Sequence, residues 1–222
     1  MMKIDTKLIN KNFVKGRKGQ KIKYIVIHDT WNFGTSATAM NHYIYFNGAY
    51  RGASAHYFVD QKQILQIVKD EDTSWAVGDG NGKYGITNSN SVSIEICVND
   101  GNYEMEINRT LWLTKHLMKK YNVSIDNVVR HYDASRKMCP SIMVANNWQG
   151  WKVFKSRLEA LDKVEEVVPV AKEVVRINYN GIIKELDGNF VDDKNYVGVR
   201  ELAETLGFTV TWDNNTKTVI IK

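Results

Sequence analysis

Alternation of apolar and polar residues predicts four strands in the first hundred residues. Ser91–Val98 alternates strictly, so its aliphatic residues share one face while Ser93, Glu95 and Cys97 share the other. Ser54–Asp60 and Gln63–Lys69 resemble a strand pair joined at Gln61-Lys62. Ile22–His28 places two isoleucines on one face, and we expect a buried strand with His28 at its carboxyl end.

Helical patterns lie between and after these strands. Thr35–Phe46 opens on Thr and Ser, which are good N-cap residues, and stops at Asn47-Gly48. Asn108–Tyr121 and Trp148–Leu161 have the apolar spacing of amphipathic helices. Because strands and helices interleave along the chain, the sequence predicts an α/β layered domain over residues 1–161.

The remainder of the chain predicts a linker and a small second domain. Residues 162–173 hold no turn signature and include Pro169, one of two prolines, which indicates an extended, partly stiff linker. Residues 174–222 are expected to form an α+β domain, which at about 50 residues is near the lower limit for independent stability. Its expected elements are a hairpin of Val174–Tyr179 and Ile182–Leu186 around Asn180-Gly181, a helix at Val199–Leu206, and a hairpin of 209–212 with 216–221.

Positive charge is concentrated in the first domain. Residues 1–161 contain 22 Lys and Arg against 14 Asp and Glu, whereas residues 174–222 contain 6 against 7. A basic domain favours a polyanionic partner, either nucleic acid or an acidic bacterial envelope, although a merely soluble surface has the same composition. Nucleic-acid binding is supported by charge alone, and we rank it last among the candidate functions.

Cysteine use and hydropathy bear on the cellular compartment. With two cysteines, Cys97 and Cys139, in 222 residues, a disulfide framework is not expected and a reducing origin is favoured. No window approaches the roughly 20 apolar residues of a membrane span, and no apolar stretch follows Met1–Lys7, so a signal peptide is not expected. We therefore expect synthesis in the cytoplasm.

Three residues of types that bind zinc, two histidines and one cysteine, occur at positions that favour a shared site. His131 and Cys139 are too far apart to share a helix face, so a loop must bring them together, and His28 ends a strand. Two imidazoles and one thiolate suit tetrahedral Zn²⁺ and leave a fourth position for water, as in catalytic sites. Lys137 lies in the same loop as Cys139, where its ammonium can stabilise an oxyanion.

The candidate ligands, and two further candidate site residues, His56 and Glu95, also have other interpretations. His28 can be a satisfied core histidine, and Cys139 with His131 can form a cysteine peptidase pair, although Cys139 precedes Pro140 rather than opening a helix. His56 either contacts substrate or packs in its strand. Glu95 either lies on a half-exposed strand or acts as a general base toward the attacking water.

Four ordered segments resemble the type-2 N-acetylmuramoyl-L-alanine amidases, a zinc-dependent family related to peptidoglycan recognition proteins. The segments are Ile25-Val-Ile-His28-Asp-Thr30, Ser54-Ala-His-Tyr-Phe58, Ser91-Val-Ser-Ile-Glu95 and His131-Tyr-Asp-Ala-Ser-Arg-Lys-Met-Cys-Pro140. The resemblance covers roughly residues 22–158. It implies a central mixed sheet flanked by helices.

The resemblance also implies site roles and an activity. It implies that His28, His131 and Cys139 bind Zn²⁺, that Lys137 supports the oxyanion, and that a peptidoglycan hydrolase cleaves the amide between N-acetylmuramic acid and L-alanine. Such a protein would be an endolysin or an autolysin that acts on the cell wall after release. Glu95 matches members with a glutamate on this strand, and is assigned the general-base role.

The chain departs from the family pattern at two places. Ala55 stands where one branch carries a tyrosine, and Trp75-Ala-Val-Gly78 replaces a Trp-His-Ala-Gly segment, so Trp75 is expected to line the groove without the neighbouring histidine. The rival functions are a non-catalytic peptidoglycan-binding protein and a cysteine-type cell-wall peptidase.

The second domain carries a separate resemblance. Tyr196–Asp213 and Thr218–Ile221 resemble the small repeat named after the copper amine oxidase N-terminal domain. Despite that name, no histidine or cysteine lies beyond Cys139, so no copper site is expected. Its place behind a catalytic domain suggests attachment to the cell wall.

Overall fold

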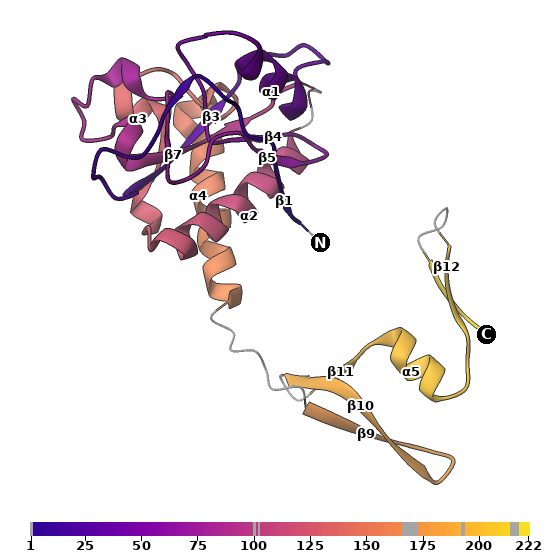
Figure 1. Ribbon diagram of the computed structural model, residues 1–222. Helices are drawn as coiled ribbons and strands as arrows, with labels where there is room; N and C mark the ends of the chain where they lie inside the picture. The colour runs from indigo at the N-terminus through magenta and orange to yellow at the C-terminus, as the bar shows by residue number, and fades with distance from the viewer. Residues whose placement is uncertain (1, 100, 102, 166–172, 192–193, 214–217) are drawn as a thin grey trace. The chain divides into compact units, whose positions relative to one another are not determined.

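The first unit of the computed structural model, residues 1–162, is built around a six-stranded mixed sheet in the order β1-β5-β4-β7-β3-β8 (Figure 1). Its strands are β1 (Ile4–Thr6), β3 (Tyr24–Asp29), β4 (Tyr57–Val59), β5 (Ile64–Gln66), β7 (Ser91–Ile96) and β8 (Val128–Arg130). β4 and β5 run antiparallel, and the other four neighbouring pairs run parallel. The expected α/β fold with a mixed central sheet is therefore confirmed.

The structure describes residues 2–99, 101, 103–165, 173–191, 194–213 and 218–222. Two compact units divide the chain, Met1–Asp162 and Lys163–Lys222. Among the described residues, no helix has the length and hydropathy needed to cross a membrane.

Helices cover both faces of the sheet. α2 (Glu104–Tyr121) and α4 (Ala145–Glu165) pack on the face that carries the buried isoleucines of β3 and β7, forming the largest core cluster. α1 (Ala39–Gly48) packs on the other face, against Phe58 and Cys97. Since side chains alternate along a strand, His28 and Glu95 project from this second face.

Shorter elements line the edges of the sheet. They are β2 (Phe13–Val14), which pairs with β6 (Thr73–Ser74), then η1 (Gly78–Gly80), η2 (Asn88–Asn90), η3 (Ile125–Asn127), α3 (His131–Ser135) and η4 (Ser141–Met143). The segment expected to be a loop between His131 and Cys139 is thus helical over its first five residues.

Two buried charged residues join segments that are distant in sequence. The guanidinium of Arg17 donates to the backbone carbonyls of Ser89 and Ser91 at 3.1 and 2.9 Å. The carboxylate of Asp70, which is 3% exposed, accepts from the hydroxyls of Tyr57 and Tyr121, each at 2.6 Å. Burial acts to raise the pKa of Asp70, but these bonds and the bond from the Lys120 ammonium outweigh it and leave that pKa below its ordinary value.

Two helices, α1 and α4, begin or end at residues other than the expected ones. α1 begins at Ala39 because Thr38 is its N-cap, with its hydroxyl accepting from the Asn41 backbone N–H at 3.3 Å. α4 continues to Glu165, so residues 162–165 are helical, and the expectation of an extended linker was wrong there. Glu173, the last residue of the expected linker, begins β9, and residues 166–172 lie outside the described residues.

The second unit contains the expected hairpins. β9 (Glu173–Tyr179) pairs antiparallel with β10 (Ile182–Val191) around Asn180 and Gly181, which both have positive φ (52° and 82°), as a two-residue hairpin turn requires. β11 (Lys194–Val197) joins β10, α5 (Val199–Thr205) follows, and β12 (Val210–Asp213) pairs with β13 (Thr218–Ile221). Residues 214–217 of the second hairpin lie outside the described residues.

Candidate metal centre

The carboxyl ends of two parallel strands bring the two histidines together. His28 is the fifth residue of β3, and His131 begins α3 directly after β8. In the register of these strands Ile27 lies opposite Arg130, so the next residues, His28 and His131, leave the sheet side by side. Topology therefore places two imidazoles at one edge of the sheet.

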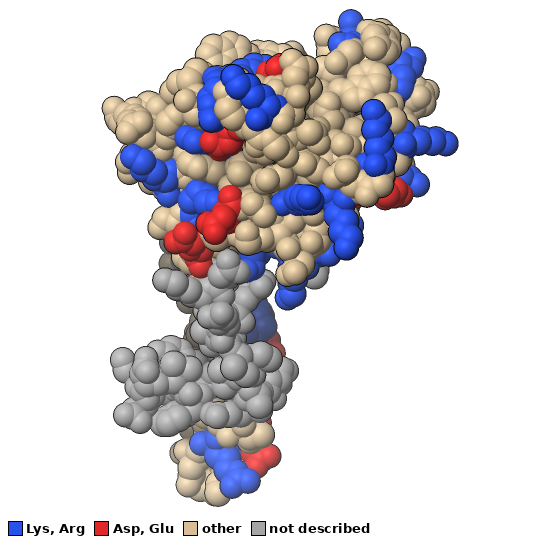
Figure 2. Space-filling model, turned by 90° about the vertical axis from the view of Figure 1, so that its left-hand side faces the viewer, with Lys and Arg blue, Asp and Glu red and all other residues tan. Residues whose placement is uncertain are grey.

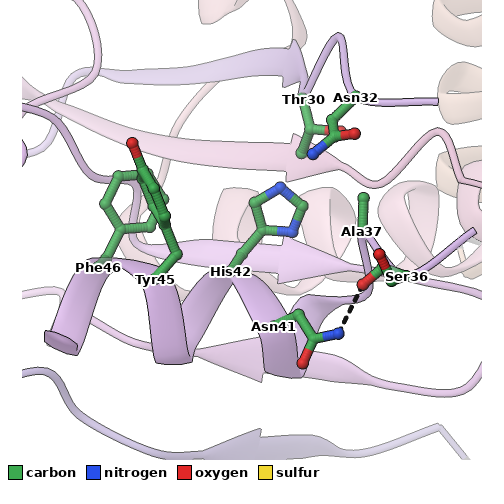
Figure 3. Close-up of a pocket in the computed structure, with 8 residues that line it drawn as sticks. All are labelled: Thr30, Asn32, Ser36, Ala37, Asn41, His42, Tyr45 and Phe46. Carbon is green, nitrogen blue, oxygen red and sulfur yellow. Dashed lines mark hydrogen bonds between the residues drawn. The ribbon is translucent and has the colours of Figure 1, made fainter. Parts of the chain in front are cut away.

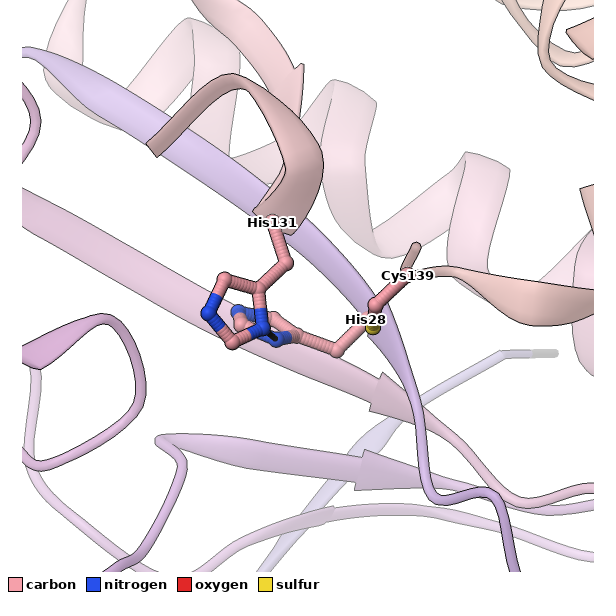
Figure 4. A group of neighbouring side chains, drawn as sticks. All are labelled: His28, His131 and Cys139. Carbon is pink, nitrogen blue, oxygen red and sulfur yellow. Dashed lines mark hydrogen bonds between the residues drawn. The ribbon is translucent and has the colours of Figure 1, made fainter. Parts of the chain in front are cut away.

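Cys139 completes a compact cluster with these histidines (Figure 4). One nitrogen or sulfur from each of the three residues lies within 4.8 Å of the others, and all three side chains are buried. The Nδ1 atoms of His28 and His131 are 3.1 Å apart. The cluster is a possible metal site.

Asp29 fixes the backbone that carries Cys139. Its Oδ2 accepts from the Ser141 hydroxyl at 2.7 Å and from the Ile142 backbone N–H at 2.8 Å. Since Asp29 follows His28 in β3, one strand end supplies a histidine and also ties down the loop that bears the thiol. This anchor was not predicted from the sequence.

Asp79 orients the second histidine. Its Oδ1 accepts from His131 Nε2 at 2.8 Å, which leaves Nδ1 of His131 unprotonated and facing His28. Burial acts to raise the pKa of Asp79, but its bonds with His131 and Ser135 hold that pKa below the ordinary value.

Gly80 allows this contact to form. A Cβ at Gly80 would collide with the backbone carbonyl of Ala134, so only glycine lets η1 approach α3 closely enough for Asp79 to reach His131. The sequence signal for Asp79 is therefore a carboxylate between two glycines, which the sequence analysis did not single out.

The protonation states of the histidines suit metal binding. Burial lowers the pKa of His28 well below its ordinary value, and burial also lowers the pKa of His131 despite the Asp79 carboxylate. Both imidazoles are therefore neutral at pH 7 and keep a lone pair for a cation.

Glu95 lies beside the cluster on the neighbouring strand. It pairs in register with His28, and its Oε1 is 3.9 Å from His28 Nδ1. Burial, with a smaller contribution from Asp29, raises the pKa of Glu95 to about 8. A carboxyl group with this pKa can hold or release a proton near neutral pH.

Unpartnered polar atoms gather at the same edge of the sheet. Among the described residues, His28 Nε2, Asp29 Oδ1, Thr30 Oγ1 and Glu95 Oε2 are buried without a hydrogen-bond partner. Such groups are costly unless an ion, water or ligand satisfies them. Two nitrogen donors, one sulfur donor and nearby unpaired oxygens fit a divalent cation with a preference for nitrogen and sulfur ligands.

Lys137 and Trp75 lie where the sequence predicted a groove. With His131 they line a pocket of about 390 Å³, whose other lining residues are Gly52, Ala53, Ala76, Gly78, Asp79 and Asn88. The ammonium of Lys137 and the indole of Trp75 therefore share one cavity with a candidate ligand.

His56 lies away from this cavity. Its side chain is 0% exposed, and its Nδ1 accepts from the Ser93 backbone N–H at 3.1 Å and lies 2.9 Å from the Ser74 hydroxyl. The Arg17 guanidinium packs against its Nε2 at 2.9 Å. With no exposed atoms, His56 has no surface to offer a substrate in this conformation, and its contacts are those of a packing residue.

A separate cavity, of about 420 Å³, lies along α1 and does not share lining residues with the pocket of His131 (Figure 3). His42, Tyr45 and Phe46 face it from the helix, and Thr30 and Asn32 face it from the segment after β3. The ring of His42 stacks on Phe58 at 4.8 Å, as expected for a packing residue, yet its free edge points into this cavity (Figure 3).

The charge expected from the sequence is visible on the surface. Figure 2 shows Lys and Arg side chains spread over the visible face of the first unit, with fewer acidic side chains among them. That face has an excess of positive charge available to a polyanion.

Comparison with known proteins identifies the family. A family model described as N-acetylmuramoyl-L-alanine amidase matches residues 18–142. A probable N-acetylmuramoyl-L-alanine amidase from Bacillus licheniformis is 36% identical over 173 residues, covering 70% of this chain and 48% of that protein. The amidase XlyA from Bacillus subtilis is 36% identical over 130 residues, covering 58% of this chain and 42% of that protein.

Solved structures agree with these relatives. The catalytic domain of XlyA matches with a TM-score of 0.62 and 33% identity, covering 71% of this chain and 99% of that domain. The PlyG catalytic domain matches with a TM-score of 0.61 and 32% identity, covering 78% and 100%. The chain spans about half the length of the curated relatives it matches. The family model covers more than half of the chain, and the chain therefore belongs to the N-acetylmuramoyl-L-alanine amidase family.

Proposed function

We propose that this protein is a zinc-dependent peptidoglycan hydrolase that cleaves the amide between N-acetylmuramic acid and L-alanine. The observation that carries the proposal is the buried cluster of two neutral histidines and one cysteine, which lies beside the carboxyl group of Glu95 and of which His131 lines a pocket. Family membership and the names of the relatives support the same bond specificity.

His28, His131 and Cys139 would hold the zinc ion. Bound zinc would polarise the scissile carbonyl and lower the pKa of the attacking water. Three protein ligands leave a coordination position free for this chemistry, whereas a structural site would use four. Asp79 keeps His131 in the tautomer that presents Nδ1 to the metal.

Glu95 would act as the general base and then as the general acid. Its carboxyl group, whose Oε1 lies 3.9 Å from His28 Nδ1, would accept a proton from water and pass it to the leaving amine of L-alanine. Lys137, in the same pocket as His131, would stabilise the negative charge on the carbonyl oxygen. Trp75 would form a wall for the substrate in that pocket.

The rival cysteine peptidase has little physical support. Burial raises the pKa of the Cys139 thiol, and the neighbouring carboxylate of Glu95 raises it further. A nucleophilic cysteine needs the opposite shift, whereas a divalent cation would itself deprotonate the thiol. A non-catalytic binding protein, the other rival, would have no use for a general base beside the metal ligands.

Two further features suggest how the enzyme reaches its substrate. The basic face of the first unit would attract anionic wall polymers, an attraction that salt weakens. The second unit, through its resemblance to the copper amine oxidase N-terminal repeat, would attach the enzyme to the cell wall. An endolysin or autolysin made in the cytoplasm and released onto the wall fits this arrangement.

Digestion of purified bacterial cell walls tests the proposal. New L-alanine amino groups without new reducing sugars are expected, lost after chelation and restored by zinc. Release of a different end would move the cleavage to another bond, and binding without any new end would favour a recognition protein. Activity that survives complete removal of zinc would point to the cysteine peptidase.

A further inference from the structure

Trp75 separates the pocket of the candidate metal centre from a neighbouring cavity of about 280 Å³. Both cavities are lined by Trp75, Gly78 and Asn88, so they are immediate neighbours. The remaining lining of the second cavity is Val14, Lys18, Thr73, Val77, Asn81, Gly82, Thr87 and Ser89. A substrate held at His131 and Lys137 can therefore extend past Trp75 into this second cavity.

The chemistry of the second cavity favours an anion. Lys18 is the charged residue of its lining, and the others are apolar or carry neutral hydroxyl and amide groups. Asn88 lines both cavities, and its side chain is held in place by hydrogen bonds. Its Oδ1 accepts from the backbone N–H groups of Ala76 and Val77 at 3.0 and 2.7 Å. The NH₂ group of Asn88 therefore points away from these two backbone groups.

The backbone holds Lys18 in place. Lys18 and Gly19 have φ of 50° and 76°, and the Gln20 N–H donates to the Arg17 carbonyl at 2.9 Å, which makes a tight turn. The side chain of Arg17 is buried and anchors this turn to Ser89, which itself lines the cavity. The ammonium of Lys18 is thus carried by a turn of fixed position.

We propose that this second cavity binds a free carboxylate on the peptide half of the substrate, with Lys18 as the specificity-determining residue. The inference rests on the proposed function. In a muramoyl peptide the lactyl carboxyl group is consumed by the scissile amide, so the sugar half carries no charge and ionised carboxylates lie on the peptide half. A cation beyond Trp75 therefore fixes the direction in which the substrate lies across the metal centre.

Two synthetic muramoyl peptides that differ at one group test this proposal on the full-length protein. The residue after L-alanine carries a free α-carboxylate in one and a carboxamide in the other. Dissociation constants are measured by calorimetry, and cleavage of the muramoyl amide is followed in parallel. The variants are Lys18→Met, Lys18→Arg and Lys21→Met, the last being an exposed lysine outside the lining. Methionine meets the same backbone strain as lysine at positive φ, so the comparison isolates the charge.

We expect the wild-type protein to bind the free acid about three- to tenfold more tightly than the amide. This is the gain expected when the Lys18 ammonium forms a partly exposed hydrogen bond with the charged carboxylate. Lys18→Met should abolish this preference through weaker acid binding, while Lys18→Arg and Lys21→Met retain it. No preference in the wild type, or one that survives Lys18→Met, would overturn the proposal. Failure to cleave either peptide would count against the proposed function, and the dissociation constants would still decide the role of Lys18.

Discussion

Removal of the Asp79 carboxylate, by Asp79→Ala, should weaken zinc binding although Asp79 is not expected to touch the metal. The carboxylate accepts from His131 Nε2 at 2.8 Å and so fixes both the tautomer and the orientation of that ring. Without it, His131 can protonate at Nδ1 or rotate, and zinc must restore the productive state as it binds. Asp79→Asn keeps an acceptor without the charge and should have an intermediate effect.

The size of the effect follows from the setting of this pair. Loss of a carboxylate that supports a metal-bound histidine costs about 10- to 100-fold in affinity. The side chain of His131 is 5% exposed, but that of Asp79 is 47% exposed, so water screens the interaction. We therefore expect the lower end, about a tenfold loss, equivalent to about 1.4 kcal/mol.

Competition with a chromophoric chelator measures the zinc dissociation constant of each variant. Ser135→Ala removes the other side chain that bonds Asp79, at 3.1 Å, and should leave zinc affinity within about twofold of wild type if the His131 contact is the one that matters. Thermal unfolding without metal checks that each variant folds. An Asp79→Ala protein with wild-type zinc affinity would refute the assignment of Asp79 as a positioning residue.

Four other predictions address catalysis, stability and attachment. Glu95→Gln should abolish hydrolysis while zinc content by atomic absorption stays intact. Ile94→Ala should lower the free energy of unfolding in urea by about 2–5 kcal/mol, because Ile94 is 0% exposed in the main core. Asp70→Asn should cost about 1–3 kcal/mol at pH 7. Because the pKa of Asp70 is lowered on folding, this difference is present above the ordinary value of 3.8 and is lost as the pH falls through the folded pKa. Deletion of residues 163–222 should reduce pelleting with cell walls and leave cleavage of small muramoyl peptides unchanged.

Each of these predictions has a contrary result. Retained hydrolysis in Glu95→Gln would remove Glu95 as the base, and a loss of zinc with it would make Glu95 a ligand. A cost below 1 kcal/mol for Ile94→Ala would mean that the core relaxes around the missing atoms. An Asp70 effect that is the same at pH 3 and pH 7 would exclude its charge as the cause. Unchanged pelleting after the deletion would locate wall attachment in the first unit.

The strands that carry the site could be predicted because their sequence patterns are long. β3 and β7 have six residues each, enough for alternation to appear, and they supply His28 and Glu95. The turn at Asn180-Gly181 could also be predicted, because few residue types other than Asn and Gly adopt the left-handed backbone conformation that such a turn requires. β1 and β8 have three residues each, and unlike the equally short β4 and β5 they are not joined in a hairpin, so the strand that places His131 was missed.

The supporting residues of the site could not be predicted because tertiary contacts define them. Asp79 and His131 are 52 residues apart in sequence, and Asp29 and Ser141 are 112 apart. No local pattern links such pairs. His56 illustrates the reverse case, since a histidine in an apolar strand is equally compatible with a groove and with the buried contacts to Ser74 and Ser93 that the structure has.

The pairing of His28 with Glu95 across two neighbouring strands has a consequence for how the activity can be lost. Because side chains alternate, a one-residue slip of β7 against β3 would turn Glu95 into the α2 face and set Ile94 or Ile96 beside His28. Such a slip would also bury a carboxylate in the main core, so the fold itself resists it. The backbone pairing of the two strands thus sets the distance between the proposed base, Glu95, and the proposed ligand, His28. Substitution of a single metal ligand would then abolish hydrolysis without disturbing the sheet or the groove beside it. A single mutation could thus convert a hydrolase of this fold into a protein that only binds its substrate.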